Sequence, residues 1–166
     1  MKKFLAGVYT VICFAVMACT TQPERMILPN ELEVVNLQSE GDSICMACKY
    51  QVVVFHDFDR QNFFPYKKQF LWSELKDRFP EVGFIFYCSG QDKQKLVREL
   101  VSLEFPFPVY HDPQFIFYRL NRLDSIQATY DVLHSFHLKD GFPVKRAQIG
   151  MAEYFLEEIE VILKKE

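Results

Sequence analysis

Two groups of residues in this 166-residue chain have types and spacing that could do chemistry. The first is Cys45 and Cys48, which have the Cys-x-x-Cys spacing of redox pairs. Such a pair can be a structural disulfide, two free thiols, an active dithiol or half of a metal site. A zinc site would need two more ligands, and no second Cys-x-x-Cys or His-x-x-x-His occurs in the sequence. We therefore expect no metal and no cofactor.

The second group follows an apolar run. Val52–Phe55 is continuous and rich in β-branched residues, which predicts a central strand buried on both faces. Polar side chains come directly after it, at the end of a strand where α/β sheets place ligands. With nearby aromatic residues and one later histidine they form a candidate binding loop for a peptide or protein: His56, Asp57, Asp59, Phe63, Phe64 and His134. The alternative is a solvated loop whose carboxylates stabilise the next helix N-terminus.

Strand and helix patterns alternate along the rest of the chain. Glu31–Val35 alternates polar and apolar residues, which suits an early edge strand. Asp140-Gly141 separates two late strands and is typical of a hairpin turn. The other predicted elements are a helix over Pro65–Arg78, a strand over Gly83–Cys88, a helix from Ser89 to about Leu103 with Ser89 as its cap, a strand over Pro106–His111, a short helix from Asp112 to Leu120, strands over Ser135–Leu138 and Val144–Ile149, and a helix over Met151–Lys165.

The first residues have the pattern of a targeting segment. Lys2 and Lys3 precede the uncharged run Phe4–Val16, which is too short for a comfortable membrane span. The sequence VMAC that ends at Cys19 resembles the bacterial lipoprotein signal, in which the cysteine is acylated. The alternative is an ordinary secretory signal with a chance cysteine. The predicted organisation is a signal peptide over 1–18, a tether with a candidate edge strand over 19–44, and one domain over 45–166.

A lipidated Cys19 implies that the protein is anchored to the lipid bilayer in the cell envelope and faces the periplasm. Cys13 lies in the signal, so Cys45, Cys48 and Cys88 remain for a disulfide-permissive compartment. Cys88 ends an inner strand and is expected to be a buried core thiol. The net charge of −3 and the lack of a basic cluster argue against nucleic acid as a partner.

The order β-α-β-α-β-α-β-β-α resembles the thioredoxin fold, with the extra strand and helix of the TlpA and peroxiredoxin-like branch. The landmarks are VVVFHDF, the helix that contains Trp72, FPFPVYHDP and the hairpin FHLKDGFPVKRAQIG. The resemblance covers about Val52–Lys165, and small bacterial thioredoxin-like lipoproteins are the nearest look-alikes. It implies an α/β domain with a central mixed sheet of about four to five strands flanked by helices.

The resemblance also implies a Cys-x-x-Cys pair at the N-terminus of the helix after the central strand, where the helix dipole lowers the thiol pKa. Counting back from Trp72, those positions hold Asn62 and Pro65. The proline expected before the fourth strand is replaced by Leu133 or His134. We therefore predict a module without the usual dithiol, with a non-catalytic binding or accessory role.

The alternative function is a thiol–disulfide oxidoreductase or a peroxide-handling protein that uses Cys45 and Cys48. Against it, the pair precedes the central strand, so it would lie at the far end of the sheet from the family's site. Glu40 and Asp42 are close in sequence and would raise the pKa of the thiols. A third hypothesis is a small-molecule binder at the loop His56–Asp59.

Overall fold

The computed structural model describes residues 24–36, 44–60, 72–126, 133–149 and 151–164. Within these ranges strands and helices alternate and a hairpin precedes the last helix, as predicted. The elements are β1 (Glu33–Val35), β2 (Tyr50–Asp57), α1 (Trp72–Arg78), β3 (Val82–Ser89), α2 (Lys93–Ser102), β4 (Val109–His111), α3 (Ile116–Leu120), a 3-10 helix (Leu123–Ser125), β5 (Leu133–Lys139), β6 (Phe142–Arg146) and α4 (Ala152–Lys164).

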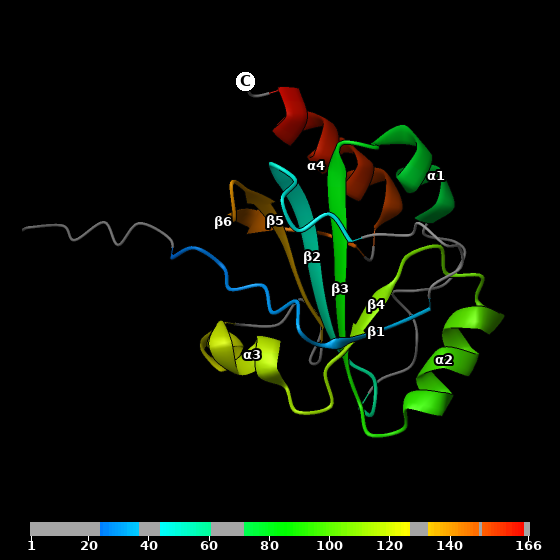
Figure 1. The fold of residues 1–166 in the computed structure, drawn as a ribbon. Helices are drawn as coiled ribbons and strands as arrows, with labels where there is room; N and C mark the ends of the chain where they lie inside the picture. Colours follow the sequence, from blue (N-terminus) through cyan, green and yellow to red (C-terminus); the bar gives the residue numbers. More distant parts are fainter. Residues whose placement is uncertain (1–23, 37–43, 61–71, 127–132, 150, 165–166) are drawn as a thin grey trace, which may run out of the picture.

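The strands form one mixed sheet in the order β1-β4-β3-β2-β5-β6 (Figure 1). Strands β2, β3 and β4 run parallel, whereas β1, β5 and β6 pair antiparallel with their neighbours. The described part of the sheet has six strands, more than the predicted four to five. The difference arises because the short segment Glu33–Val35 pairs with β4 and extends the edge of the sheet.

Helices α1, α2 and α4 cover one face of the sheet, which we call the helical face. Trp72 of α1 lies at the centre of this core, with its ring edge-on to Phe86 at 5.3 Å and to Phe155 at 6.0 Å between ring centroids. Every residue of β2 is buried, as the continuous apolar run predicted. Edge-to-face aromatic pairs add packing energy beyond their buried area, so this aromatic cluster fixes the helices on the sheet.

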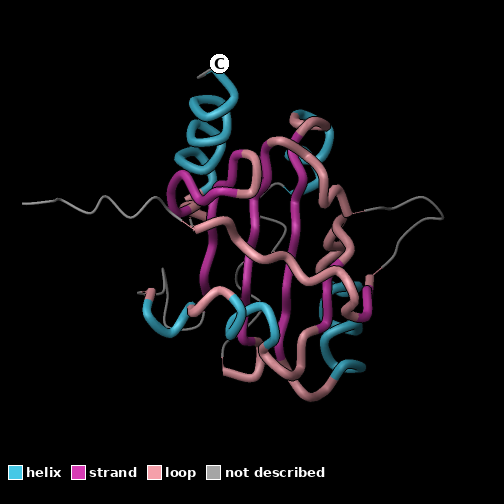
Figure 2. The backbone as a smooth tube through the Cα atoms, turned by 60° about the vertical axis from the view of Figure 1, so that its left-hand side comes forward, coloured by secondary structure: helices cyan, strands magenta, loops and turns pink. Residues whose placement is uncertain are grey.

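The opposite face, which we call the strap face, is covered by α3 and by the extended segment that contains β1. Figure 2 shows this segment running across the strands. Tyr87 of β3 stacks on Phe117 of α3 with 4.2 Å between ring centroids, and its hydroxyl donates to the carbonyl of Pro29 at 3.0 Å. A second buried cluster therefore holds an irregular segment against the sheet.

The predicted hairpin turn is confirmed. Lys139 pairs with Phe142, and the two residues between them, Asp140 and Gly141, have φ values of 54° and 82°. Two successive positive φ values match the twist of hairpin strands, and Asp-Gly adopts them readily. The carbonyl of Gly141 accepts a hydrogen bond from the backbone N–H of Met26 at 2.9 Å, which places the strap segment beside the turn.

Helix boundaries differ from the predicted ones, and the short helix α3 begins at Ile116 and not at Asp112. Helix α2 begins at Lys93 and is capped by the carboxylate of Asp92, not by Ser89, because β3 continues through Ser89 to pair with Asp57. Helix α1 is described from Trp72 onward, and the earlier part of the predicted helix lies outside the described residues.

The longest helix of the described ranges is α4 with 13 residues, and no helix there has the length and apolar character needed to cross a bilayer.

Candidate functional site

Cys45 and Cys48 form a disulfide in the loop that leads into β2. The S–S distance is 2.09 Å and the two Cα atoms are 5.5 Å apart. Cys45 is exposed to solvent and Cys48 is half-buried. Of the four alternatives considered for this pair, the structure shows a disulfide, and Cys45 is the more exposed of its two residues.

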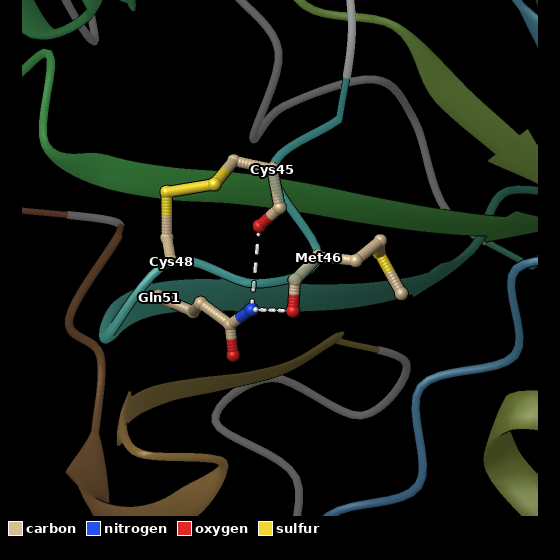
Figure 3. The surroundings of a disulfide bond; sticks show 4 residues. All are labelled: Cys45, Met46, Cys48 and Gln51. Carbon is tan, nitrogen blue, oxygen red and sulfur yellow. Dashed lines mark hydrogen bonds between the residues drawn. A yellow bond between two sulfur atoms is a disulfide. The ribbon is translucent and has the colours of Figure 1, made fainter.

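The loop that carries the disulfide lies on the strap face, over the first residues of β2 and β3 (Figure 3). The side-chain amide of Gln51 donates to the carbonyl of Met46 at 2.8 Å and to that of Cys45 at 3.3 Å. Opposite Gln51 in the sheet is Gly83, whose missing Cβ would lie 2.7 Å from the carbonyl oxygen of Cys45. The disulfide loop thus packs on the buried side-chain amide of Gln51 and on the backbone of Gly83.

The position of the pair agrees with the sequence-based prediction. Tyr50, two residues after Cys48, pairs with Val82 at the start of β3, so the disulfide lies at the amino ends of the parallel strands. His56 pairs with Cys88 at the other end of the same two strands. The disulfide and the predicted binding loop are therefore at opposite ends of the sheet.

Lysine side chains surround the residue that follows this loop. The ammonium groups of Lys49 and Lys139 lie 5.2 Å and 5.4 Å from the centroid of the Tyr50 ring. The backbone N–H of Asp140 donates to the carbonyl of Lys49 at 2.8 Å, which holds the hairpin turn beside the disulfide loop. The two ammonium groups thus lie over the Tyr50 ring, which packs on the helical face, and the acidic residues Glu40 and Asp42 are outside the described residues.

The predicted binding loop begins later than expected. Strand β2 continues through Asp57, so His56 and Asp57 are buried strand residues and only Asp59 is exposed. Burial lowers the pKa of His56 to about 4. Asp59 accepts a hydrogen bond from the backbone N–H of Gln91 at 3.0 Å. Among the described residues, the Oδ1 atom of Asp57 and the hydroxyl of Ser89 have no hydrogen-bond partner.

His134 is not brought together with His56. The residue opposite His56 in β5 is Leu133, and His134 pairs with Phe55, so its side chain is on the strap face. There its ring lies 5.6 Å from that of Tyr118 and 6.4 Å from that of Phe55. His134 is therefore part of an aromatic cluster. The other two members of the predicted loop, Phe63 and Phe64, lie outside the described residues.

Two further sequence predictions concern Cys88 and the segment that starts at His111. Cys88 carries a buried thiol on the helical face, as predicted. The predicted helix start at Asp112 is wrong, because α3 begins at Ile116; the carboxylate of Asp112 instead accepts the backbone N–H groups of Ile116 at 2.7 Å and Phe117 at 2.9 Å in the first turn of that helix. Within the described ranges, no group of three or more His, Cys, Asp or Glu side chains could hold a metal ion.

Gln51 and Gly83 do not stand out in the sequence as functional residues. A weak signal exists for each, because glutamine is unusual in a strand that is otherwise apolar, and glycine in a strand often marks a close backbone approach. Neither signal says what approaches. That information comes from the pairing of β2 with β3, which sets both residues under the disulfide loop.

No family model and no curated protein matches this chain. Solved structures do match. A thioredoxin-like protein in its oxidised form is 11% identical with a TM-score of 0.57, over 87% of this chain and 97% of that one. AhpC of Mycobacterium tuberculosis is 15% identical with a TM-score of 0.50, over 70% and 75%.

A secreted disulfide oxidoreductase of Mycobacterium tuberculosis, homologous to DsbE of E. coli, is 14% identical with a TM-score of 0.49, over 69% of this chain and 81% of that one. At these identities the matches establish the fold alone. This chain therefore has a thioredoxin-like α/β fold with a mixed central sheet flanked by helices.

The prediction of a non-catalytic module is wrong. It treated the position of Cys45 and Cys48 before the central strand as a reason against redox use. The structure shows the two cysteines joined in a disulfide at the surface of a thioredoxin-like fold. These findings favour the alternative, a thiol–disulfide oxidoreductase or peroxide-handling protein that uses this pair.

Proposed function

We propose that this protein exchanges disulfides and thiols with a dithiol substrate through Cys45 and Cys48. The observation that carries the proposal is the disulfide itself, closed across a Cys-x-x-Cys spacing with Cys45 exposed to solvent. Exchange requires that an attacking thiolate can reach one sulfur of the bond. A pair with Cys45 exposed meets this requirement, whereas a fully buried structural disulfide does not.

The exchange takes place in two balanced steps. A thiolate of the substrate attacks Sγ of Cys45, the S–S bond breaks, and Cys48 leaves as a thiolate that then takes up a proton. The second thiolate of the substrate attacks the mixed disulfide and releases Cys45. The substrate loses two electrons and two protons and becomes a disulfide, and the protein pair gains them. The same steps in reverse reduce a substrate disulfide.

Attack at Cys45 follows from the exposure of the two residues. Cys48 is half-buried, and its Cβ lies 3.2 Å from the place that a Cβ on Gly83 would occupy. It is therefore suited to be the leaving and resolving thiol.

We also propose that the protein works in the cell envelope. The proposal rests on the lipoprotein-like sequence that ends at Cys19 and on a disulfide that suits an oxidising compartment. Acylation of Cys19 would anchor the domain to the membrane. We expect labelling with a radioactive fatty acid in the wild type and no labelling in Cys19→Ala; equal labelling of both would contradict the anchor.

Thiol–disulfide exchange is tested by the reduction of insulin with dithiothreitol as the reductant. We expect the wild type to accelerate the reaction and Cys45→Ser to abolish the acceleration. Cys48→Ser should accumulate a mixed disulfide on Cys45, detectable by mass spectrometry, because the resolving thiol is missing. Cys88→Ala is the matched control, since that thiol is buried away from the pair, and it should retain the activity. Acceleration that survives in Cys45→Ser/Cys48→Ser would overturn the proposal.

A further inference from the structure

The loop that carries the disulfide is held in place by contacts that do not involve sulfur. Gln51 is only 2% exposed, although its side chain is a polar amide in an apolar strand. Its Nε2 atom donates to two successive carbonyls of the loop, those of Cys45 and Met46 (Figure 3). A buried amide is costly to leave unpaired, so these hydrogen bonds fix the loop relative to β2.

Gly83 provides the second contact. The Cβ that any other residue would place here would lie 2.7 Å from the carbonyl oxygen of Cys45, 3.2 Å from Cβ of Cys48 and 3.3 Å from Cγ of Gln51. Because glycine lacks this atom, both cysteines and the glutamine can pack directly on the backbone of β3. The same two residues are paired across the strands, so the sheet register keeps Gln51 and Gly83 side by side.

We propose that Gln51 and Gly83 are positioning residues that preset the geometry of the Cys45–Cys48 pair and thereby lower its reduction potential. The inference deepens the function proposed above and rests on it for its biological meaning. The contacts of Gln51 and Gly83 are made by backbone atoms of the loop and by Cβ, so breaking the S–S bond does not remove them.

The physical reason is the conformational entropy of the reduced loop. Closing a disulfide costs the freedom that the two thiols have when they are apart. Where contacts with the sheet already restrict the reduced loop, less conformational entropy is lost on closure, so the disulfide forms more readily. Without the hydrogen bonds from Gln51 the reduced loop gains freedom, closure becomes less favourable, and the pair is easier to reduce.

The test is the redox equilibrium of the folded protein with glutathione. One protein disulfide and two glutathione thiols give one protein dithiol and one glutathione disulfide, so two electrons are exchanged. Gln51→Met has a similar length and lacks the N–H donors. We expect its equilibrium to shift about tenfold toward the dithiol, which corresponds to a potential less negative by about 30 mV for a two-electron couple.

Asn36→Gly is the matched control. The side-chain amide of Asn36 is buried and also donates to two carbonyls, those of Phe105 and Phe107, both at 2.8 Å. These hydrogen bonds hold the residues that lead into β4. Glycine tolerates the positive φ of 60° that Asn36 adopts. Asn36→Gly should therefore lower the free energy of unfolding without moving the potential.

Gly83→Ala tests the proposal from the other side and covers the case in which Gln51→Met does not fold. The added methyl group would clash with the carbonyl oxygen of Cys45. The reduced loop can move away from this clash more easily than the loop closed by the disulfide. The reduction potential should therefore again become less negative. Wild-type potentials in the folded variants, with only the stability lowered as in Asn36→Gly, would overturn the proposal. This result is separate from the insulin assay, because a pair without catalytic turnover still has a measurable potential.

Discussion

At the scale of single residues, two buried histidines make the stability depend on pH. Burial lowers the pKa of His56 to about 4. Burial, with a smaller contribution from the charge of Arg146, lowers the pKa of His134 to about 4. The unfolded chain binds these protons near pH 6.5, and the folded protein binds them only near pH 4. Between these values the unfolded state holds more protons, so stability falls as the pH is lowered from 6.5 toward 4.

His134→Phe should remove part of this dependence. His134 is 5% exposed among aromatic rings, and its Nδ1 atom has no partner in the described structure. Phenylalanine fits such surroundings and cannot be protonated. In urea unfolding we expect the variant to be within about 1 kcal/mol of the wild type at pH 7 and about 2 kcal/mol more stable than it at pH 5.

His137→Phe is the control for this prediction. The Nε2 atom of His137 lies 3.0 Å from a carboxylate oxygen of Glu158, so phenylalanine would remove one hydrogen bond from this buried carboxylate. This variant should be less stable than the wild type at both pH values. If His134→Phe lost stability in the same way, the interpretation of His134 as a neutral ring whose Nδ1 atom makes no hydrogen bond would be wrong.

At the scale of elements, one carboxylate joins the last helix to the hairpin. Glu158 of α4 is 8% exposed, yet it interacts with groups from β5, from β6 and from the connection between β6 and α4. Its oxygens lie 3.0 Å from Nε2 of His137, 2.6 Å from Nζ of Lys145 and 3.0 Å from the backbone nitrogen of Gln148. Burial alone would raise the pKa of Glu158, but these hydrogen bonds outweigh it and hold the pKa below its usual value.

Glu158→Gln should therefore be destabilising. The substitution removes the charge that pairs with Lys145 and leaves the amide N–H groups opposite donors. We expect the free energy of unfolding at pH 7 to fall by about 2–3 kcal/mol, in the range for a buried charge network that loses one member. The measurement is urea denaturation of both proteins.

Glu160→Gln, on the same helix, is the control for Glu158→Gln. Glu160 forms ion pairs with Arg78 and Lys164 at the surface, where such pairs contribute little. Its loss should cost less than about 0.5–1 kcal/mol. Similar losses for the two variants would show that burial of Glu158 gives its contacts no special weight.

The stabilisation from Glu158 should also disappear in acid, as the pH falls through its lowered folded pKa.

At the scale of the whole molecule, the disulfide lies outside the buried core. The fully buried residues of the two hydrophobic clusters come from the chain after residue 49 and from the strap segment, and the half-buried Ile44 and Met46 of the disulfide loop pack against one of these clusters. Cys45 and Cys48 close a loop of only four residues, at the edge of this structure. A disulfide in such a loop can be reduced while the core stays intact.

Reduction of the disulfide should lower stability without unfolding the protein. In the loop-entropy treatment a four-residue loop contributes about 2 kcal/mol, less than a long loop would. We expect the far-UV circular dichroism of the reduced protein at 25 °C to match that of the oxidised protein, with a modest decrease in Tm. Loss of the spectrum on reduction would show that the disulfide is needed for folding and would weigh against a role in turnover.

Features that depend on neighbours in the chain could be predicted from the sequence alone. The buried central strand follows from Val52–Phe55, and the hairpin turn follows from Asp140-Gly141. Each depends on backbone preferences or on hydrogen bonds within a few residues. The resemblance to the thioredoxin fold rested on the order of such elements, and the fold is confirmed.

The geometry of the candidate site depends on pairing between distant strands, which local sequence patterns do not contain. The register of β2 with β3 places Gly83 beside Gln51 and both under Cys45, and the register of β2 with β5 places His134 and His56 on opposite faces of the sheet. The cysteine pair was visible in the sequence, but its interpretation depended on the position expected from the family. Only the tertiary structure could show that the pair closes at the surface and rests on the sheet, because these properties arise from residues that the chain brings together across more than thirty positions.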